Sequence, residues 1–203
     1  MNSGSIDLEG EEIVTTVMFS DIRSFTSLSE RMTPRVLVSF LNDYFSYMVT
    51  PIAEQNGVVN KFIGDSIMAV FSPVFGVADH AGAAVRAATA MRNALARFNQ
   101  TTGYGSIRHG IGIHTGVLIA GTVGAENRRE YTVIGDTVNV ASRIESQTKV
   151  AETDILVSGD TVDRISETVR RDIELVETSP VTMRGKTIAT RLFAVGSVGS
   201  EEA

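Results

Sequence analysis

The feature of this sequence that most constrains its fold is a change of hydrophobic spacing between its first two apolar segments. Residues 13–19 (IVTTVMF) are rich in β-branched side chains, which favour a buried strand. From Pro34 onward the apolar residues recur with the spacing of a helix that packs one face against a core. Thr33 provides an N-cap before this proline, and Asn56-Gly57 predicts the end of the helix. The chain therefore begins with a strand followed by a long amphipathic helix.

The same alternation of strand and helix continues along the chain. Gly64-Asp65-Ser66 has the composition of a tight turn between two short strands. The expected segments are strands at 58–63 and 67–71, a helix at 77–98, strands at 107–114 and 117–123 separated by Thr115-Gly116, a projecting loop or strand extension at 124–131, a helix at 137–150, and strands near 155–157, 173–176 and 189–195. This order predicts an α+β fold, with a ferredoxin-like βαββαβ core, C-terminal α/β additions and an antiparallel sheet flanked by helices.

The composition excludes several kinds of site. The 203 residues include no cysteine and only three histidines, so thiolate chemistry is excluded and no histidine cluster indicates zinc. A formal net charge of −6 argues against a nucleic-acid partner. No uncharged stretch approaches the roughly 20 apolar residues of a membrane span. The first twelve residues are small, polar and acidic, which does not fit a secretory signal.

Two aspartates lie where the predicted strands end. Asp21 follows the first strand, and Asp65 lies at the apex of the hairpin turn. Two carboxylates at one sheet edge repel each other unless a cation lies between them or one takes up a proton. Mg²⁺ prefers such oxygen ligands together with substrate phosphates, and two metal ions can stabilise a phosphoryl displacement. Either aspartate alone is more simply explained as a turn residue, so the prediction rests on the pair.

Several ordered motifs surround these aspartates. They are FSDIRSFT at 19–26, NKFIGDSIMAVF at 60–71, GIHTG at 112–116, YTVIGDTVNVASRIE at 131–145 and RGK at 184–186. Together they resemble the motifs of the class III adenylate and guanylate cyclase catalytic domains. The resemblance is to the bacterial type, in the adenylate cyclase branch that carries a threonine among its base-reading residues, and it extends from about Val14 to Val195.

The resemblance implies a two-metal site that acts on a nucleoside triphosphate. It assigns Asp21, Asp65 and the main-chain carbonyl of Ile22 as ligands of two divalent cations, Mg²⁺ or Mn²⁺, with Ca²⁺ expected only in a non-productive complex. The turn that ends with Phe25 and Thr26 would present main-chain N–H groups to the terminal phosphates. Lys186, in the RGK motif, would contact the same phosphates.

The resemblance also implies that the substrate is ATP. Lys61 occupies the position that contacts adenine, and a lysine offers only donors, which suit N1 of adenine but not the N–H of guanine. Thr132 occupies the second base-reading position, where many adenylate-making relatives carry aspartate. Its hydroxyl can accept a hydrogen bond from the adenine amino group but can also donate one, so it discriminates less strongly than aspartate. By position alone, Lys61 is explained about equally well as a solvated lysine on a strand face, and Thr132 has a substantial alternative as a β-branched residue that fills a strand.

Asn139 and Arg143 have i, i+4 spacing, which places them on one face of the predicted helix. By resemblance, Asn139 orients the ribose and Arg143 stabilises charge that develops on the α-phosphate, a role suited to a guanidinium. In the family, one subunit supplies the metal ligands and the other supplies these residues. Because this chain carries both sets, we expect a homodimer with two complete sites.

One departure from the family pattern concerns Gly110, where many relatives carry arginine; Arg108, on the same strand face, is a candidate replacement.

Three alternative functions stay open. The first is a guanylate cyclase, against which Lys61 argues. The second is a catalytically silent nucleotide-binding module, against which the retained aspartates, Asn139 and Arg143 argue. The third is a structural α+β domain with coincidental acidic residues.

We expect one nucleotide cyclase catalytic domain at 13–197, after a lead-in at 1–12 and before a tail at 198–203. The abrupt start predicts an upstream sensor or regulatory part in a longer protein. The domain itself is expected to lie in the cytoplasm, and the upstream segments could anchor the full-length protein to a membrane. The expected partners are ATP and a second copy of the chain.

Overall fold

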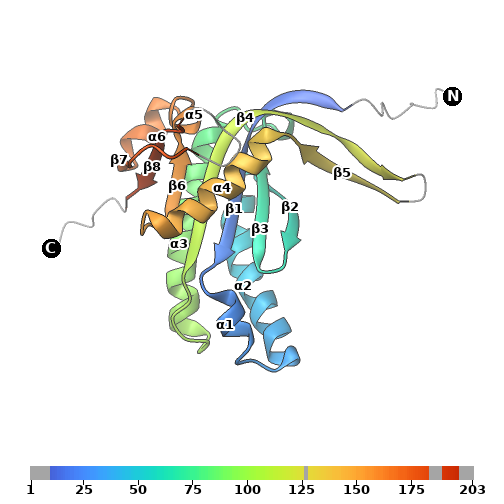
Figure 1. The fold of residues 1–203 in the computed structure, drawn as a ribbon, viewed down its shortest axis with the longest axis vertical. Coiled ribbons are helices and arrows are strands. Elements are labelled where there is room, and N and C mark those ends of the chain that lie inside the picture. Colours follow the sequence, from blue (N-terminus) through green and yellow to red (C-terminus); the bar gives the residue numbers. More distant parts are fainter. Residues whose placement is uncertain (1–9, 126–127, 183–188, 197–203) are drawn as a thin grey trace.

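The structure, a computed structural model, describes residues 10–125, 128–182 and 189–196 (Figure 1). Within these residues, an eight-stranded sheet has the order β2-β3-β1-β4-β6-β8-β7, with β5 added to β4. The strands are β1 (Glu11–Ile22), β2 (Val58–Ile63), β3 (Ser66–Phe71), β4 (His109–Ala125), β5 (Arg128–Ile134), β6 (Ile155–Ser158), β7 (Leu175–Glu177) and β8 (Leu192–Val195). The helices are α1 (Phe25–Ser29), α2 (Pro34–Glu54), α3 (His80–Thr101), α4 (Asp136–Val150), α5 (Gly159–Val162) and α6 (Glu167–Arg171), with a 3₁₀ turn at Pro73–Phe75.

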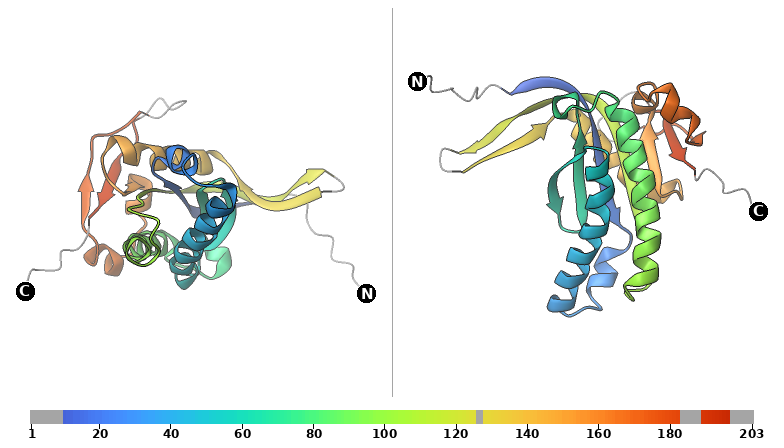
Figure 2. Two further views of the ribbon diagram at one scale, coloured as in Figure 1. Left: turned by 90° about the horizontal axis from the view of Figure 1, so that it is seen from below. Right: turned by 180° about the vertical axis from the view of Figure 1, so that it is seen from behind.

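The first part of the sheet confirms the predicted ferredoxin-like core. Strands β4, β1, β3 and β2 lie side by side and pair antiparallel. Helices α2 and α3 cover one face of this sheet, and α4 lies across the other (Figure 1, Figure 2). The pair β4–β6 is parallel, because β5 and α4 lie between these strands in the chain and return it to the same end of the sheet. The C-terminal additions extend the sheet through β6, β8 and β7.

Strand β1 lies in the middle of the core, which explains its uninterrupted apolar run. Val17 and Met18 point to opposite faces and are both buried, because helices cover the sheet on both sides. Helix α2 begins where predicted, since the Thr33 side chain accepts the Val36 N–H at 3.4 Å. Helix α3 begins at His80, later than expected, because Asp79 caps it.

Strand β4 differs from the expected pair of shorter strands. It runs without a break from His109 to Ala125, and Thr115 and Gly116 both lie within its ladder with β1. On its other edge β4 pairs with β5 from Ile119 to Ala125 and forms a projecting arm, so residues 124–125 and 128–131 extend the strands rather than form a loop. We refer to residues 117–125 and 128–134 as the β4–β5 arm.

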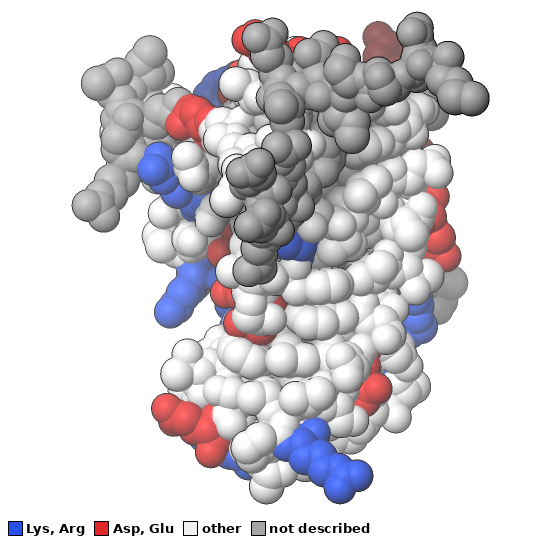
Figure 3. Space-filling view, turned by 90° about the vertical axis from the view of Figure 1, so that its right-hand side faces the viewer, with Lys and Arg blue, Asp and Glu red and all other residues white. Residues whose placement is uncertain are grey.

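Among the side chains that the structure describes, few on the face that carries β2 are charged (Figure 3). Several large apolar residues on β2 and the β4–β5 arm are about half exposed: Val58, Phe62, Ile63, Val117, Ile119, Val123 and Ile134. In the part of the chain that the structure describes, no helix combines the length and the apolar character needed to cross a membrane.

Candidate active site

The two predicted metal ligands meet at one edge of the sheet. Asp21 lies near the end of β1, and Asp65 lies in the turn that joins β2 to β3, the neighbour of β1. The Ser66 hydroxyl donates to Asp21 Oδ1 at 2.5 Å. The Ile22 N–H donates to Asp65 Oδ2 at 3.1 Å. Gly64 in this turn has a φ of 64°, in the left-handed region that favours glycine.

The electrostatics of this edge fit a bound cation. Burial and, second, the nearby charge of Asp21 together raise the pKa of Asp65 to about 6. The two negative carboxylates therefore repel each other, and a divalent cation between them would offset this repulsion. The Ile22 side chain is a buried hydrocarbon without a donor atom, so this residue could contribute only its main-chain carbonyl. A donor set made entirely of oxygen suits Mg²⁺ or Mn²⁺.

A sharp turn follows β1 and leads into α1; we call residues 21–24 the β1–α1 turn. Ser24 has a left-handed conformation with φ 56°, and its side chain does not cap the helix. Phe25 packs against the core, whereas Thr26 is exposed. A cleft of about 530 Å³ opens beside this turn. It is lined by Asp21, Ile22, Arg23, Ser24, Arg108, Thr148, Lys149, Glu152, Thr153 and Asp154.

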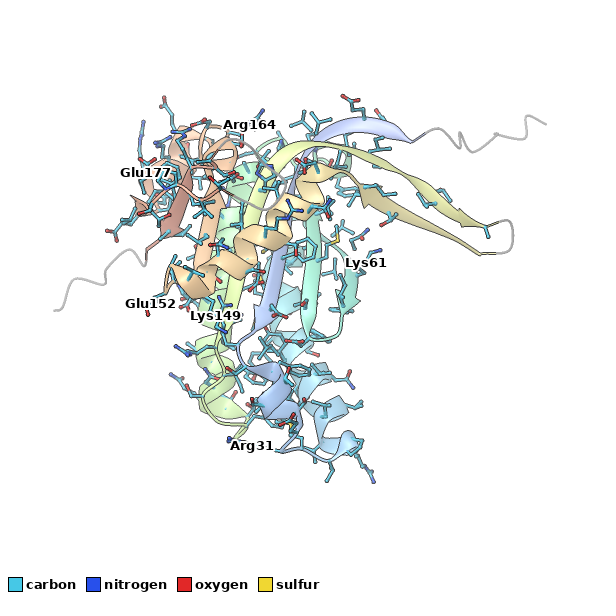
Figure 4. All side chains as sticks on the ribbon, viewed as in Figure 1. Arg31, Lys61, Lys149, Glu152, Arg164 and Glu177 are labelled. Carbon is cyan, nitrogen blue, oxygen red and sulfur yellow. The ribbon has the colours of Figure 1, made fainter. Side chains whose placement is uncertain are left out.

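The two predicted base-reading residues lie on one side of the molecule. Lys61 is on β2 (Figure 4), and Thr132 is on β5. The Thr132 hydroxyl donates to Asn60 Oδ1 at 3.5 Å, so the residue before Lys61 connects β2 to β5. A bulge between Val59 and Lys61 places Asn60 outside the regular ladder with β3. Sequence reasoning did not single out Asn60, although it stands within the NKFIGD motif.

Helix α4 carries Asn139 and Arg143 on the side facing away from the sheet. Ala141 and Glu145 on the opposite side are buried against β4, whereas Asn139 is exposed and Arg143 is half-buried. Within the described part of the chain, neither Asn139 nor Arg143 has a side-chain hydrogen bond.

The helix also begins far from the aspartates of its own chain. The Thr137 hydroxyl donates to the Val117 carbonyl at 2.5 Å, whereas Asp21 lies opposite Gly110. These two points on β4 are roughly 23 Å apart at about 3.3 Å per strand residue. The structure thus brings Asp21, Ile22 and Asp65 together, but it does not bring Asn139 to them.

The space left by Gly110 is filled by an arginine that sequence reasoning did not assign. A Cβ at Gly110 would lie 2.0 Å from Arg23 Nη2, so the Arg23 guanidinium occupies this position rather than Arg108. Arg23 is ion-paired with Glu145 of α4 at 3.3 Å, and its Nη2 also donates to the Thr148 hydroxyl. Arg108 instead lines the cleft. Lys186 lies outside the described residues.

Two buried groups near the aspartates also have shifted pKa values. Burial and, second, the charge of Asp21 raise the pKa of Glu145 to about 7, against the opposing effect of Arg23. His109 lies behind the sheet edge, where its Nδ1 is 3.2 Å from the Tyr44 hydroxyl. Burial lowers the pKa of His109 to about 3, so this histidine is neutral near pH 7. His114 is also buried and lies 2.8 Å from the Ser158 hydroxyl, in keeping with a structural role.

This fold and these motifs occur together in known proteins. The sequence model of one protein family, described as the adenylate and guanylate cyclase catalytic domain, matches residues 9–195. The chain belongs to this family. The predicted resemblance is therefore confirmed, and the divalent cations that cyclase domains of this family generally use fit the oxygen donors at the sheet edge.

Individual relatives of this cyclase include enzymes named for either nucleotide. An adenylate cyclase of Anabaena cylindrica is 42% identical over 187 residues, which are 89% of this chain and 36% of that protein. The crystal structure of the guanylyl cyclase Cya2 has a TM-score of 0.84 at 32% identity and covers 95% of this chain and 96% of its own. That of the adenylyl cyclase CyaB from P. aeruginosa has a TM-score of 0.82 at 30% identity and covers 97% and 100%.

Two facts follow from these comparisons. The chain spans only about a third of the length of the Anabaena cyclase, so the comparison with that protein concerns its cyclase part. Adenylyl and guanylyl cyclases both superpose closely on this chain. The fold therefore fits both adenylyl and guanylyl cyclases.

Proposed function

We propose that this cyclase domain converts ATP to 3′,5′-cyclic AMP and pyrophosphate, with two divalent cations, at the interface of a homodimer. The observation that carries the proposal is the pairing of Asp21 and Asp65 at one sheet edge, where the pKa of Asp65 is raised to about 6. Two such carboxylates with a main-chain carbonyl between them are suited to metal-dependent phosphate chemistry. The proposed catalytic domain comprises residues 13–197, between a lead-in at 1–12 and a tail at 198–203.

The base-reading residues favour ATP. Lys61 offers donors only, which match the N1 acceptor of adenine and not the N1–H of guanine. Thr132 donates its hydroxyl hydrogen to Asn60, which leaves its oxygen lone pairs to accept from the adenine amino group. Asn60 thus removes the ambiguity of a hydroxyl that could either donate or accept. The close fit to a guanylyl cyclase structure makes GTP the competing substrate.

In the proposed reaction, the ribose 3′-oxygen attacks the α-phosphorus. The bond between this phosphorus and the oxygen that bridges the α- and β-phosphates breaks, and pyrophosphate leaves. The hydroxyl proton passes to water. Divalent ions at this edge would lower the pKa of the 3′-hydroxyl and offset charge on the leaving phosphates. Asp21, Asp65 and the Ile22 carbonyl would hold these ions. No side chain acts as a nucleophile.

The remaining residues bind and orient the nucleotide. The β1–α1 turn, Phe25 and Thr26 offer main-chain N–H groups to the terminal phosphates, and Lys186 adds a cation there. Asn139 orients the ribose. Arg143 stabilises charge on the α-phosphate with a fork of donors that stays charged. These contributions are chiefly positioning and electrostatic stabilisation.

The orientation of α4 supports a site shared by two chains. Asn139 and Arg143 face away from the sheet, and the start of α4 is roughly 23 Å along β4 from the aspartates. These residues would therefore serve the aspartates of a second copy. The half-exposed apolar residues on β2 and the β4–β5 arm offer a surface that such a copy could cover (Figure 3). An upstream regulatory part is a further proposed partner of the domain.

Mixing two inactive variants tests the shared site. Asp65→Ala removes a metal ligand, and Asn139→Ala removes the ribose contact, so each homodimer should lose activity. Random exchange makes half of the dimers mixed, each with one intact site, so roughly a quarter of the wild-type activity should return. A mixture of Asp65→Ala with Asp21→Ala is the matched control, because both changes affect the same half-site. Equal activity in the two mixtures would refute the shared site.

A nucleotide assay tests the substrate. With Mg²⁺ or Mn²⁺, cyclic AMP formation from ATP should exceed cyclic GTP formation from GTP. The reverse order would identify a guanylate cyclase. A protein that bound ATP but released no pyrophosphate would instead be a silent nucleotide-binding module.

A further inference from the structure

We propose that Arg23 is a positioning residue for the metal-binding carboxylates and that it acts by fixing the β1–α1 turn to helix α4. The inference rests on the proposed two-metal function. Arg23 lies between Ile22 and Ser24, immediately after the residues that would bind the ions. Its side chain points back across β4 to α4, where it contacts Glu145 and Thr148.

The contacts of the guanidinium are directional and largely shielded from solvent. Arg23 Nη1 donates to Glu145 Oε1 at 3.3 Å, and Nη2 donates to the Thr148 hydroxyl. The side chains of Arg23 and Glu145 are only 18% and 11% exposed, so water screens the pair weakly. Two donors on one rigid plane fix both the position and the orientation of the guanidinium.

A missing side chain on β4 makes this arrangement possible. Gly110 lies directly opposite Asp21 in the β1–β4 ladder. A Cβ at this position would lie 2.0 Å from Arg23 Nη2 and 2.4 Å from the Thr148 hydroxyl oxygen. Any larger residue would therefore displace the guanidinium. Gly110 and Arg23 are therefore complementary, because the lack of a side chain at Gly110 leaves the space that the Arg23 guanidinium occupies.

The result is a turn held by three kinds of contact. The Arg23 N–H donates to the Arg108 carbonyl at 2.8 Å, which holds the main chain against β4. The Ile22 N–H donates to Asp65, which links the turn to the β2–β3 hairpin. The Arg23 side chain adds the link to α4. Without that link, the carbonyl of Ile22 and the carboxylate of Asp21 would have more conformational freedom, and metal ions would bind more weakly.

Electrostatics alone predicts the opposite effect, which makes the proposal testable. Removing Arg23 takes a positive charge away from the aspartates and leaves Glu145 without its partner. Both changes would attract a divalent cation more strongly. A positioning role instead predicts weaker binding, because loss of a residue that orients metal ligands typically costs about 10- to 100-fold in affinity.

The experiment measures Mn²⁺ binding to the metal-free full chain, by the electron paramagnetic resonance signal of free Mn²⁺. The variants are Arg23→Gln, Arg23→Lys and Gly110→Ala, with Lys149→Gln as the matched control that removes an exposed cation from the same cleft. We expect Arg23→Gln and Gly110→Ala to raise the Kd for Mn²⁺ by about 10- to 100-fold. Arg23→Lys should restore part of the affinity, because an ammonium can pair with Glu145 but cannot make both contacts. Lys149→Gln should bind as the wild type does.

Several results would overturn the proposal. They are unchanged or tighter Mn²⁺ binding by folded Arg23→Gln, equal weakening by Lys149→Gln, or a wild type that binds no Mn²⁺. Gly110→Ala keeps every charge, so it tests the geometry even if Arg23→Gln fails to fold. Because the assay needs no turnover, a wild type that bound Mn²⁺ yet made no cyclic nucleotide would refute the proposed function and leave this inference intact.

Discussion

Replacing Gly112 with alanine should separate α4 from the sheet by a distance that the structure specifies. A Cβ at Gly112 would lie 2.0 Å from the Glu145 amide nitrogen, 2.5 Å from Glu145 Cα and 2.7 Å from the Ala141 carbonyl oxygen. All three atoms belong to the main chain of α4, so no change of rotamer relieves the overlap. Ordinary contact begins near 3.4 Å, and the helix must therefore move by the difference, about 1.4 Å.

This displacement should be visible in both stability and activity. Overpacking of this kind costs about 1–3 kcal/mol, which for a chain of this size lowers the unfolding midpoint by roughly 2–12 °C. Under the proposed function, moving Asn139 and Arg143 by about 1 Å lowers kcat by about 100-fold. Circular dichroism melts and a cyclic AMP assay at saturating ATP measure the two effects.

Gly116→Ala is the matched control for this experiment. Gly116 lies on the same face of β4, but a Cβ there would meet the Thr137 side-chain oxygen at 2.6 Å rather than the main chain. A side chain can rotate away, so this variant should lose less stability and less activity. If Gly112→Ala had the wild-type midpoint and kcat, the tight contact between α4 and β4 would be refuted.

Three further predictions concern the pKa shifts, the base-reading residues and the metal ligands. Glu145 has a pKa of about 7 in the folded chain against an ordinary 4.5, so the free energy of unfolding of the metal-free protein, measured with urea, should fall as the pH rises between these values. In Glu145→Gln the free energy of unfolding should depend less on pH, and an unchanged dependence would contradict the prediction. Asn60→Ala should free the Thr132 hydroxyl and lower the preference for ATP over GTP by about fivefold, the equivalent of one hydrogen bond, as ratios of kcat/KM would measure; an unchanged ratio would rule out this role. Ser66→Ala removes the donor to Asp21 and should raise the Mn²⁺ concentration for half-maximal activity by about 10-fold, with no such rise in exposed Ser46→Ala.

The elements that the sequence predicted well are those set by local chemistry. Thr33 and Pro34 mark the start of α2 because a cap and a first-turn proline act within one helical turn. Asp21 and Asp65 could be paired in advance, since a hairpin next to the first strand is the arrangement expected for this order of elements. The motifs then identified the family, which the comparison confirmed.

The features that were missed depend on contacts between distant residues. Thr115-Gly116 has the local composition of a turn, yet it stays within β4 because Thr115 bonds to Thr16 and Gly116 makes room for Thr137. The Arg23–Glu145 pair joins residues 122 positions apart, and its signal in the sequence is only the absence of a side chain at Gly110. Neither arrangement could be read from the local pattern of apolar and polar residues.

The continuity of β4 has a mechanical consequence for the protein. The strand is 17 residues long, roughly 55 Å at about 3.3 Å per residue, and it runs from the β1–α1 turn into the projecting arm. Residues 109–120 of β4 pair with β1 on one edge; on the other edge, residues 111–113 pair with β6 and residues 119–125 pair with β5. The ladder with β1 reaches from the base of the arm to the edge that holds Asp21, so under the proposed function a force that reorients the arm would reach the metal-binding carboxylates through this ladder.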